Sequence, residues 1–204
     1  GHTLPFDRPM SFEAMADDVA GIIGYLKLDK PAVLGYSMGA TTALRLAIQH
    51  PDLVSKLVHV SAPYAFEDGW HDYNLEGMRA MSGDMAEGMM QSPMYAAYAA
   101  EAPDAKNFPV LLDKVGDMMR AGFDYSEEVK QLKVPTMLVY GDWDAVRTSH
   151  SAKFFELLGG GLQDAGWDGG GMNQNRLAII PGLTHYTMIS PQLATTALGF
   201  IDAP

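Results

Sequence analysis

The hydrophobic and polar positions divide this chain into short apolar runs and longer segments with helical periodicity. Apolar runs without polar alternation are typical of buried parallel strands, and they predict strands over residues 32–36, 56–60, 134–140 and 176–180. Apolar residues spaced three and four apart predict helices over residues 11–27, 41–50, 149–158 and 191–201. Because strands and helices alternate, the pattern predicts an α/β fold whose mostly parallel sheet is flanked by helices.

The predicted helices each carry an apolar face that we expect to pack on the sheet. Ser11 is a suitable N-cap for the first helix, and Pro51 stops the second. The positions predicted to face the core are Phe12, Met15, Val19, Ile22 or Ile23 and Leu26; Ala43, Leu44, Ala47 and Ile48; and Leu193, Ala197, Leu198 and Ile201. The strand at 32–36 is apolar on both faces, so we expect it to be buried.

The alternation stops between residues 67 and 133, where helical composition and methionine dominate. Met78, Met81, Met85 and Met89 fall at helical spacing, while glycines and prolines predict a break into several short helices. The methionines form either a seam in the helical core or an adaptable apolar lid over a substrate pocket, and both can hold. We therefore predict core segments at 1–66 and 134–204, with a helical cap or lid at 67–133.

Composition narrows the functional classes. A length of 204 residues suggests one domain or one domain with an insertion, and the net charge of −11 argues against a nucleic-acid-binding face. The sequence contains neither an apolar run of the ~20 residues that span a membrane nor a signal peptide. The absence of cysteine excludes disulfides, thiolate zinc sites and a cysteine nucleophile. We expect no cofactor. We also expect no metal, since the glycine-rich loop at 159–175 lacks the spacing of an EF-hand. A cytoplasmic location is the default expectation.

The apolar run at 32–36 leads directly into Gly35-Tyr36-Ser37-Met38-Gly39 and then into a predicted helix. This order of strand, sharp turn and helix places one serine at the apex of the turn. We expect Gly35 and Gly39 to be required because larger side chains would collide where the strand and the helix pass each other. Taken alone, the pentapeptide also fits a glycine-rich turn with an incidental serine.

A serine nucleophile needs a base within hydrogen-bond reach and a third group that orients the base. Functional groups in parallel α/β sheets collect at the carboxyl ends of the strands, and Ser37, Asp144 and His185 follow three of the predicted strands. Asp142 competes with Asp144 for the acidic role. The other histidines lack the position of His185, which follows a final strand and a glycine turn.

With these motifs, the sequence resembles the α/β-hydrolase superfamily over nearly its whole length, in the lid-bearing branch that contains esterases, lactonases and peroxidase-like enzymes. Gly-Tyr-Ser-Met-Gly-Ala matches the family's nucleophile elbow, Gly-Asp-Trp-Asp its acid turn and Pro-Gly-Leu-Thr-His its histidine turn. The resemblance implies that Ser37 is the nucleophile, that His185 is the general base and later acid, and that Asp144 orients His185. It also implies that the backbone N–H of Met38 contributes to the oxyanion hole, and its spacing favours Asp144 over Asp142, which would cap or brace the turn.

The sequence departs from the family pattern at its start. Family members open with several further strands, and a His-Gly loop among them supplies a second oxyanion donor; this sequence begins at Gly1-His2, inside a related turn. We therefore expect the N-terminal part of the family's sheet to be absent from this chain and the strand at 32–36 to form an apolar edge. Three arrangements fit: a fragment, a chain completed by another, or a short form that covers its edge as a homo-oligomer.

The resemblance implies a serine hydrolase that cleaves small to medium apolar carboxylic esters through an acyl-enzyme, with a small-molecule ester as partner. The same triad serves lactonases, perhydrolases, C–C bond hydrolases and proline-type aminopeptidases, so these remain alternatives. Epoxide hydrolases and dehalogenases are excluded because they carry aspartate at the position of Ser37. A non-catalytic binding protein on a truncated hydrolase fold is an alternative from a different class.

Overall fold

The computed structural model describes residues 7–203, which form two compact units. Residues 7–11 and Asp72–Gly122 make up the smaller unit, and Phe12–His71 with residues 123–203 make up the larger one. The Gly1-His2 turn lies outside the described residues. The predicted cap at 67–133 contains the whole second segment of the smaller unit, and its role as a lid stays a prediction.

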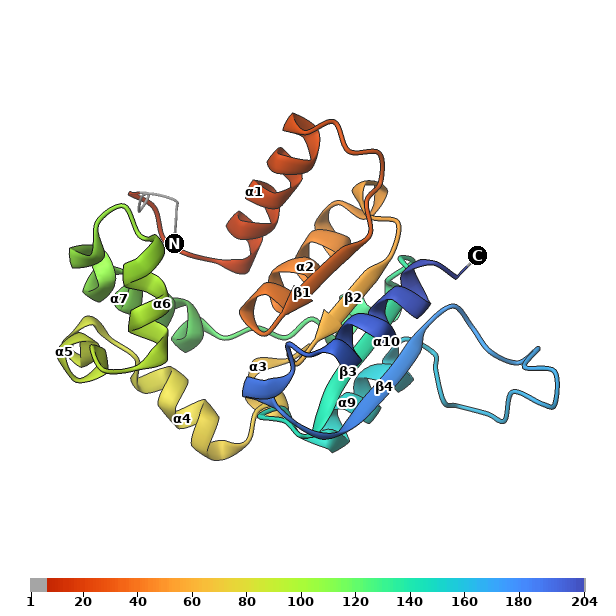
Figure 1. Cartoon of the computed structure of the whole chain (residues 1–204). Coiled ribbons are helices and arrows are strands. Elements are labelled where there is room, and N and C mark those ends of the chain that lie inside the picture. The colour runs from red at the N-terminus through yellow and green to blue at the C-terminus, as the bar shows by residue number, and fades with distance from the viewer. Residues whose placement is uncertain (1–6, 204) are drawn as a thin grey trace. The chain divides into compact units, whose positions relative to one another are not determined.

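The larger unit is built on a four-stranded parallel sheet in the order β1-β2-β3-β4 (Figure 1). Its strands are β1 (Val33–Tyr36), β2 (Leu57–Val60), β3 (Thr136–Trp143) and β4 (Arg176–Thr184). β3 and β4 extend beyond the predicted runs, with an irregularity near Gly141 before Trp143 pairs with Thr184. The predicted α/β architecture with a parallel sheet flanked by helices is therefore confirmed.

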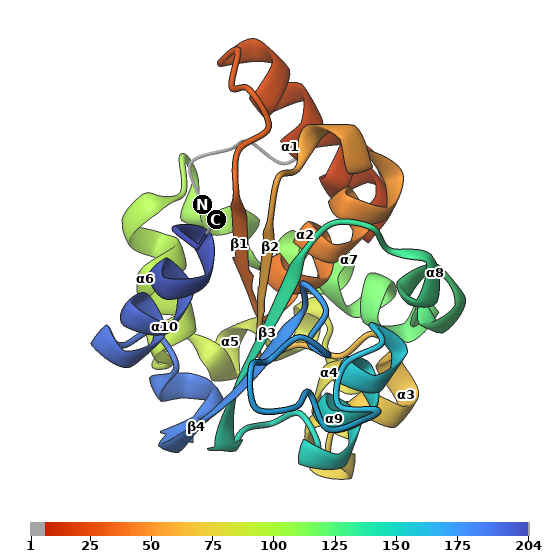
Figure 2. The same ribbon diagram turned by 90° about the vertical axis from the view of Figure 1, so that its right-hand side faces the viewer.

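Helices cover both faces of this sheet. Figure 2 shows α10 on one face and α2 and α9 on the other, and α1 packs against α2. The helices and turns of the larger unit are α1 (Phe12–Tyr25), α2 (Met38–Gln49), η1 (Pro51–Leu53), α3 (Phe66–Gly69), α8 (Ser126–Gln131), α9 (Thr148–Leu157), η4 (His185–Thr187) and α10 (Pro191–Ile201). Among residues 7–203, no helix has both the length and the apolar character needed to cross a bilayer.

The core beneath α10 joins apolar residues of three strands to one helix face. Its buried members include Val58, Val60, Met137, Val139, Ile180, Leu193, Ala197 and Phe200. Leu193 and Ala197 were predicted to face inward, whereas the predicted Leu198 is 54% exposed and Phe200 occupies the core instead. In α1, Phe12 and Ile23 are buried as predicted, whereas Leu26, just beyond the end of the helix, was predicted to face the core and is 55% exposed. The small Ala16 of α1 is fully buried, so the buried face of this helix is not made of its large apolar residues alone.

β1 lies at the edge of the described sheet, as expected from the departure from the family pattern, and it is not buried on both faces as its apolar run alone predicted. Leu34 is 45% exposed, and only Gly35 of this strand is buried. A groove of about 510 Å³ runs beside the strand, lined by Met15, Val19, Leu34, Met38 and Gly39 among others. An apolar run therefore predicted the strand correctly but not the number of its neighbours.

The smaller unit is entirely helical and contains α4 (Asp72–Ala80), η2 (Gly83–Met85), α5 (Ala86–Met89), α6 (Pro93–Glu101), η3 (Ala105–Asn107) and α7 (Phe108–Ala121). Its buried cluster consists of Ala86, Phe108 and Leu112. The methionines at helical spacing do not form one seam, because the chain breaks after α4 and Met85 is 41% exposed. Aromatic rings contribute to the packing, with the Tyr95 and Tyr98 rings at 5.0 and 5.2 Å from the Phe108 ring.

Candidate active site

The ends of neighbouring strands bring the candidate residues of the larger unit together. Tyr36 at the end of β1 pairs with Val60, and Val60 pairs with Val139 in β3. The backbone N–H groups of Ser37 and Ser61 continue this pattern, since each donates a 2.9 Å hydrogen bond to the neighbouring strand. Both serines therefore lie at the carboxyl edge of the sheet, where catalytic groups of parallel α/β folds gather.

Ser37 occupies a sharp turn between β1 and α2. Its φ of 54° and ψ of −124° are unusual for a residue with a side chain, and it is the N-cap residue of α2. A Cβ on Gly35 would lie 2.2 Å from the carbonyl oxygen of Gly39, so the turn requires glycine at position 35. Gly39 does not share this constraint, because an added Cβ would have no atom of the described chain within 4 Å. The expectation that Gly39 prevents a collision was wrong; it faces the open groove beside β1.

The structure brings all three predicted triad residues into hydrogen-bond contact. Ser37 Oγ lies 3.0 Å from His185 Nε2, and His185 Nδ1 lies 3.0 Å from Asp144 Oδ1. We assign the imidazole proton to Nδ1 because the Asp144 carboxylate only accepts hydrogen bonds, which leaves Nε2 to accept from the serine hydroxyl. This arrangement can take a proton from Ser37 when the hydroxyl attacks an electrophile.

Asp144 lies in a polar cage at the end of β3 and is 7% exposed. Besides the bond with His185, Oδ1 accepts the backbone N–H of Val146 at 3.2 Å. Oδ2 accepts the Ser61 hydroxyl at 2.5 Å and the N–H of Gly141 at 3.2 Å. Burial by itself raises the pKa of Asp144, but the hydrogen bonds from His185 and Ser61 outweigh it and leave the pKa below its ordinary value. The carboxylate is therefore ionised near neutral pH.

Asp142, the competing acid, points to a different partner. Its Oδ1 accepts the backbone N–H of Gly182 at 2.8 Å, and the residue is exposed. This bond connects the end of β3 to the glycine turn in β4. Asp142 therefore braces the backbone, while Asp144 makes the hydrogen bond with His185.

Three residues near His185 were not singled out from the sequence. Tyr36 donates its hydroxyl to the backbone carbonyl of His185 at 2.5 Å, and the Trp70 ring meets the His185 ring edge-on at 5.8 Å. Ser61, the third, holds Asp144. The positions of Tyr36 beside the candidate nucleophile and of Ser61 after a buried strand were the available signals. The contacts that these side chains make are long-range and leave no local pattern.

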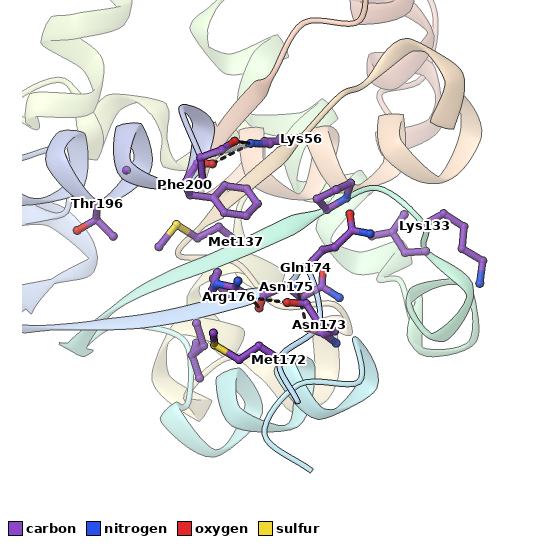
Figure 3. A pocket seen from close by; sticks show the side chains of 15 residues that line it. Lys56, Lys133, Met137, Met172, Asn173, Gln174, Asn175, Arg176, Thr196 and Phe200 are labelled. Atoms are coloured by element: carbon purple, nitrogen blue, oxygen red, sulfur yellow. Dashed lines mark hydrogen bonds between the residues drawn. The ribbon is translucent and has the colours of Figure 1, made fainter. Parts of the chain in front are cut away.

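A pocket of the larger unit lies away from these residues. Figure 3 shows this space of about 880 Å³, which is lined by Pro135 and Arg176, next to the amino ends of β3 and β4. Lys56 at its rim donates to the carbonyls of Phe200 and Ile201 at 3.1 and 2.9 Å, and so holds the end of α10. Ser37 and His185 follow the opposite, carboxyl ends of the strands. In residues 7–203, no cluster of three or more His, Asp or Glu side chains is arranged to hold a metal ion.

Comparison with known proteins agrees with the fold. The model of a family described as alpha/beta hydrolase fold matches residues 3–158. A pimeloyl-[acyl-carrier protein] methyl ester esterase of Neisseria meningitidis is 30% identical over 100% of this chain and 68% of its own length.

Solved structures share the fold at low sequence identity. The enol-lactonase of Burkholderia xenovorans LB400 matches with a TM-score of 0.63 and 18% identity, over 100% of this chain and 77% of its own. A meta-cleavage product hydrolase of Pseudomonas fluorescens IP01 matches with a TM-score of 0.62 and 18% identity, over 98% of this chain and 75% of its own. At these identities the likeness concerns the fold alone.

The chain is shorter than these relatives. Three further curated relatives, among them an esterase/lipase of Haemophilus influenzae, are matched over 32%, 26% and 62% of their lengths. The chain thus spans less than two thirds of the length of each of these three relatives.

Proposed function

The chain belongs to the alpha/beta hydrolase family, and from this premise we propose that it carries the catalytic residues of a serine hydrolase that cleaves carboxylic esters. The observation that carries the proposal is the contact of Ser37 Oγ with His185 Nε2 at 3.0 Å, on an imidazole whose other nitrogen meets Asp144. A serine hydroxyl is a weak nucleophile near neutral pH, and this arrangement supplies the base that it needs.

In the proposed reaction, Ser37 Oγ forms a bond to the acyl carbon while its proton passes to His185 Nε2. Asp144 stabilises the resulting imidazolium and keeps its orientation. When the tetrahedral intermediate collapses, His185 returns the proton to the departing alkoxide, and an alcohol leaves. Water then attacks the acyl-enzyme with His185 again as base, which releases the acid and restores the Ser37 hydroxyl.

The oxyanion of the intermediate needs hydrogen-bond donors. Met38 is the first residue of α2, and the first N–H groups of a helix have no partner within the helix. We propose that the Met38 N–H binds the oxyanion, supported by the partial positive charge at a helix N-terminus. The second donor is left unassigned.

The proposed substrates are small to medium apolar esters, bound beneath a lid formed by the helical segment at 67–133. Support comes from the methyl ester esterase among the relatives and from the apolar and aromatic composition of the segment. A lactonase, perhydrolase or C–C bond hydrolase with the same triad is the alternative, and the enol-lactonase and meta-cleavage product hydrolase share its fold. A non-catalytic binding protein is the alternative without chemistry.

The test uses Ser37→Ala, with Ser55→Ala as the control because Ser55 is an exposed serine outside the site. Hydrolysis of p-nitrophenyl acetate and butyrate should fall to background in Ser37→Ala and stay unchanged in the control. A fluorophosphonate probe should label the wild type and the control but not Ser37→Ala. Wild-type hydrolysis by Ser37→Ala would refute the nucleophile, whereas an unlabelled and inactive wild type would favour the binding protein. Parallel assays with a lactone separate the ester hydrolase from the lactonase.

We also propose that a second copy of the chain covers the edge of β1. The support is the apolar, exposed surface of that edge, where Leu34 and Met38 line the groove beside β1 and are both at least one third exposed. Light scattering should detect a dimer in the wild type and a monomer in Leu34→Lys. A monodisperse wild-type monomer would contradict this arrangement.

A further inference from the structure

We propose that Ser61 is a positioning residue for the reaction proposed above, and that its hydroxyl holds Asp144 in the orientation that His185 requires. The inference rests on the proposed function and names a residue that the triad motif does not contain. Ser61 follows directly after β2, between the strands that carry Ser37 and Asp144.

The two oxygens of the Asp144 carboxylate have separate partners. Oδ1 meets His185 Nδ1 at 3.0 Å, and Oδ2 accepts the Ser61 hydroxyl at 2.5 Å. Since the carboxylate is rigid and planar, a bond that fixes Oδ2 also fixes the direction of Oδ1. Ser61 is fully buried, so water does not compete for this bond.

The backbone of Ser61 supplies an independent observation. Its φ of 55° lies in the left-handed region, which glycine enters freely and residues with a Cβ avoid. Only Ser37, Lys27 and Lys30 share a positive φ among the described non-glycine residues, and both lysines are exposed. A glycine at position 61 would fit the turn without strain. A serine is therefore explained by its hydroxyl, whose partner is Asp144.

Removal of the hydroxyl changes the chemistry of the pair. Asp144 Oδ2 would keep the Gly141 N–H at 3.2 Å as its remaining donor, which leaves a buried carboxylate less well stabilised. Hydrogen bonds to the ionised form lower a carboxyl pKa, so losing one raises the pKa of Asp144. The reaction needs an ionised Asp144 to stabilise the imidazolium, so activity should be lost at a higher pH on acidification.

The experiment compares Ser61→Gly with Ser61→Ala. Both remove the hydroxyl, but the glycine also releases the backbone strain, so Ser61→Gly should unfold at a denaturant concentration equal to or above that of Ser61→Ala. For both variants we expect kcat on p-nitrophenyl butyrate to fall about 10- to 100-fold with KM within about twofold. The acid limb of kcat/KM should move to higher pH. Ser61→Cys, which retains a weak donor, should give an intermediate kcat.

Ser151→Ala is the matched control, because Ser151 is also fully buried and its hydroxyl donates a 3.4 Å bond to the carbonyl of Arg147 and none to Asp144 in the described chain. Its kcat and pH profile should equal those of the wild type. A Ser61→Gly variant that folds and shows wild-type kcat and an unshifted acid limb overturns the positioning role while leaving the proposed function intact. If the wild type itself neither hydrolyses esters nor reacts with fluorophosphonate, the proposed function fails.

A measurement without turnover keeps the positioning role testable in that case. The proton between His185 Nδ1 and Asp144 is expected to give a far-downfield resonance in the proton NMR spectrum. Its position should change in Ser61→Gly and not in Ser151→Ala. An identical resonance in all three proteins would overturn the positioning role.

Discussion

The hydroxyl of Tyr36 donates a hydrogen bond of 2.5 Å to the backbone carbonyl of His185, and the two rings lie 5.3 Å apart. Tyr36 immediately precedes Ser37, so the bond connects the strand that carries the nucleophile to the loop that carries the base. Burial raises the pKa of Tyr36, and the charge of Asp144 adds to this effect. The hydroxyl therefore remains a donor well into the alkaline range.

Replacing Tyr36 with phenylalanine should loosen this connection without removing the ring. We expect Tyr36→Phe to lower kcat about 10-fold, the equivalent of one hydrogen bond, and to leave KM nearly unchanged. Steady-state kinetics on p-nitrophenyl butyrate measures this effect. Tyr186→Phe is the matched control, since Tyr186 directly follows His185, its ring lies 5.5 Å from the His185 ring, and it is 82% exposed. Equal kcat values for the two variants would show that the Tyr36 hydroxyl does not hold His185.

The two aspartates after β3 should differ sharply in their effect on catalysis. Asp144→Asn removes the charge next to His185 and favours the wrong tautomer of the ring, so kcat should fall roughly 10³-fold or more. Asp142→Asn retains an oxygen that can accept the Gly182 N–H and should keep kcat within about twofold. Kinetics of the two purified variants, with circular dichroism to verify folding, decides between them. A larger loss of kcat in Asp142→Asn than in Asp144→Asn would show that Asp142 is the acid that acts with His185.

The two motif glycines provide a test of the turn itself. Gly35→Ala places a Cβ 2.2 Å from a backbone oxygen, so it should lower the free energy of unfolding of the larger unit by about 3 kcal/mol or more. Gly39→Ala meets no described atom within 4 Å and should change stability by less than about 1 kcal/mol, with a gain from helix propensity. Urea unfolding followed by tryptophan fluorescence compares the two. A similar loss in both variants would contradict the space seen beside Gly39.

Local patterns in the sequence were sufficient for the elements that depend on near neighbours. The apolar run before Ser37 and the periodicity of residues 191–201 predicted β1 and α10 at nearly their observed bounds. The order of Ser37, Asp144 and His185 also predicted which side chains the strand ends bring together. Their catalytic roles stay a proposal that the variants above test.

Properties that depend on distant parts of the chain were not predictable in this way. The 45% exposure of Leu34 follows from the position of β1 at the edge of the described sheet, which an apolar run does not encode. The bond between Ser61 and Asp144 joins residues 83 positions apart, so no local spacing indicates it. The methionine spacing failed for the opposite reason, because the chain breaks between α4 and α5 interrupt a pattern that looked continuous.

The core of the larger unit contains a histidine that should make its stability depend on pH. His59 in β2 is fully buried, its ring meets Phe154 edge-on at 5.1 Å, and neither ring nitrogen has a hydrogen-bond partner in the described chain. Burial lowers the pKa of His59 to about 3, and the nearby His150 adds to the effect. Burial likewise lowers the pKa of His150 to about 4, against the opposing influence of Asp68 and Asp124.

The direction of this pH dependence follows from the protonation of His59 in the folded and the unfolded chain. Above the ordinary histidine pKa of about 6.5, His59 is neutral in both the folded and the unfolded chain and stability does not depend on it. Between about 6.5 and about 3, only the unfolded chain binds the proton, so the free energy of unfolding falls as the pH falls. From pH 6.5 to pH 4.5 the contribution of His59 should amount to roughly 2 to 3 kcal/mol.

His59→Leu should remove this contribution while it preserves an apolar contact with Phe154. We expect the variant to be as stable as the wild type or more stable at pH 8, and to lose about 2 kcal/mol less than the wild type between pH 6.5 and pH 4.5. Urea unfolding at a series of pH values measures both quantities. The exposed His71, changed to glutamine, is the control and should keep the wild-type slope. A pH dependence of His59→Leu equal to that of the wild type would show that His59 does not remain neutral in the folded core.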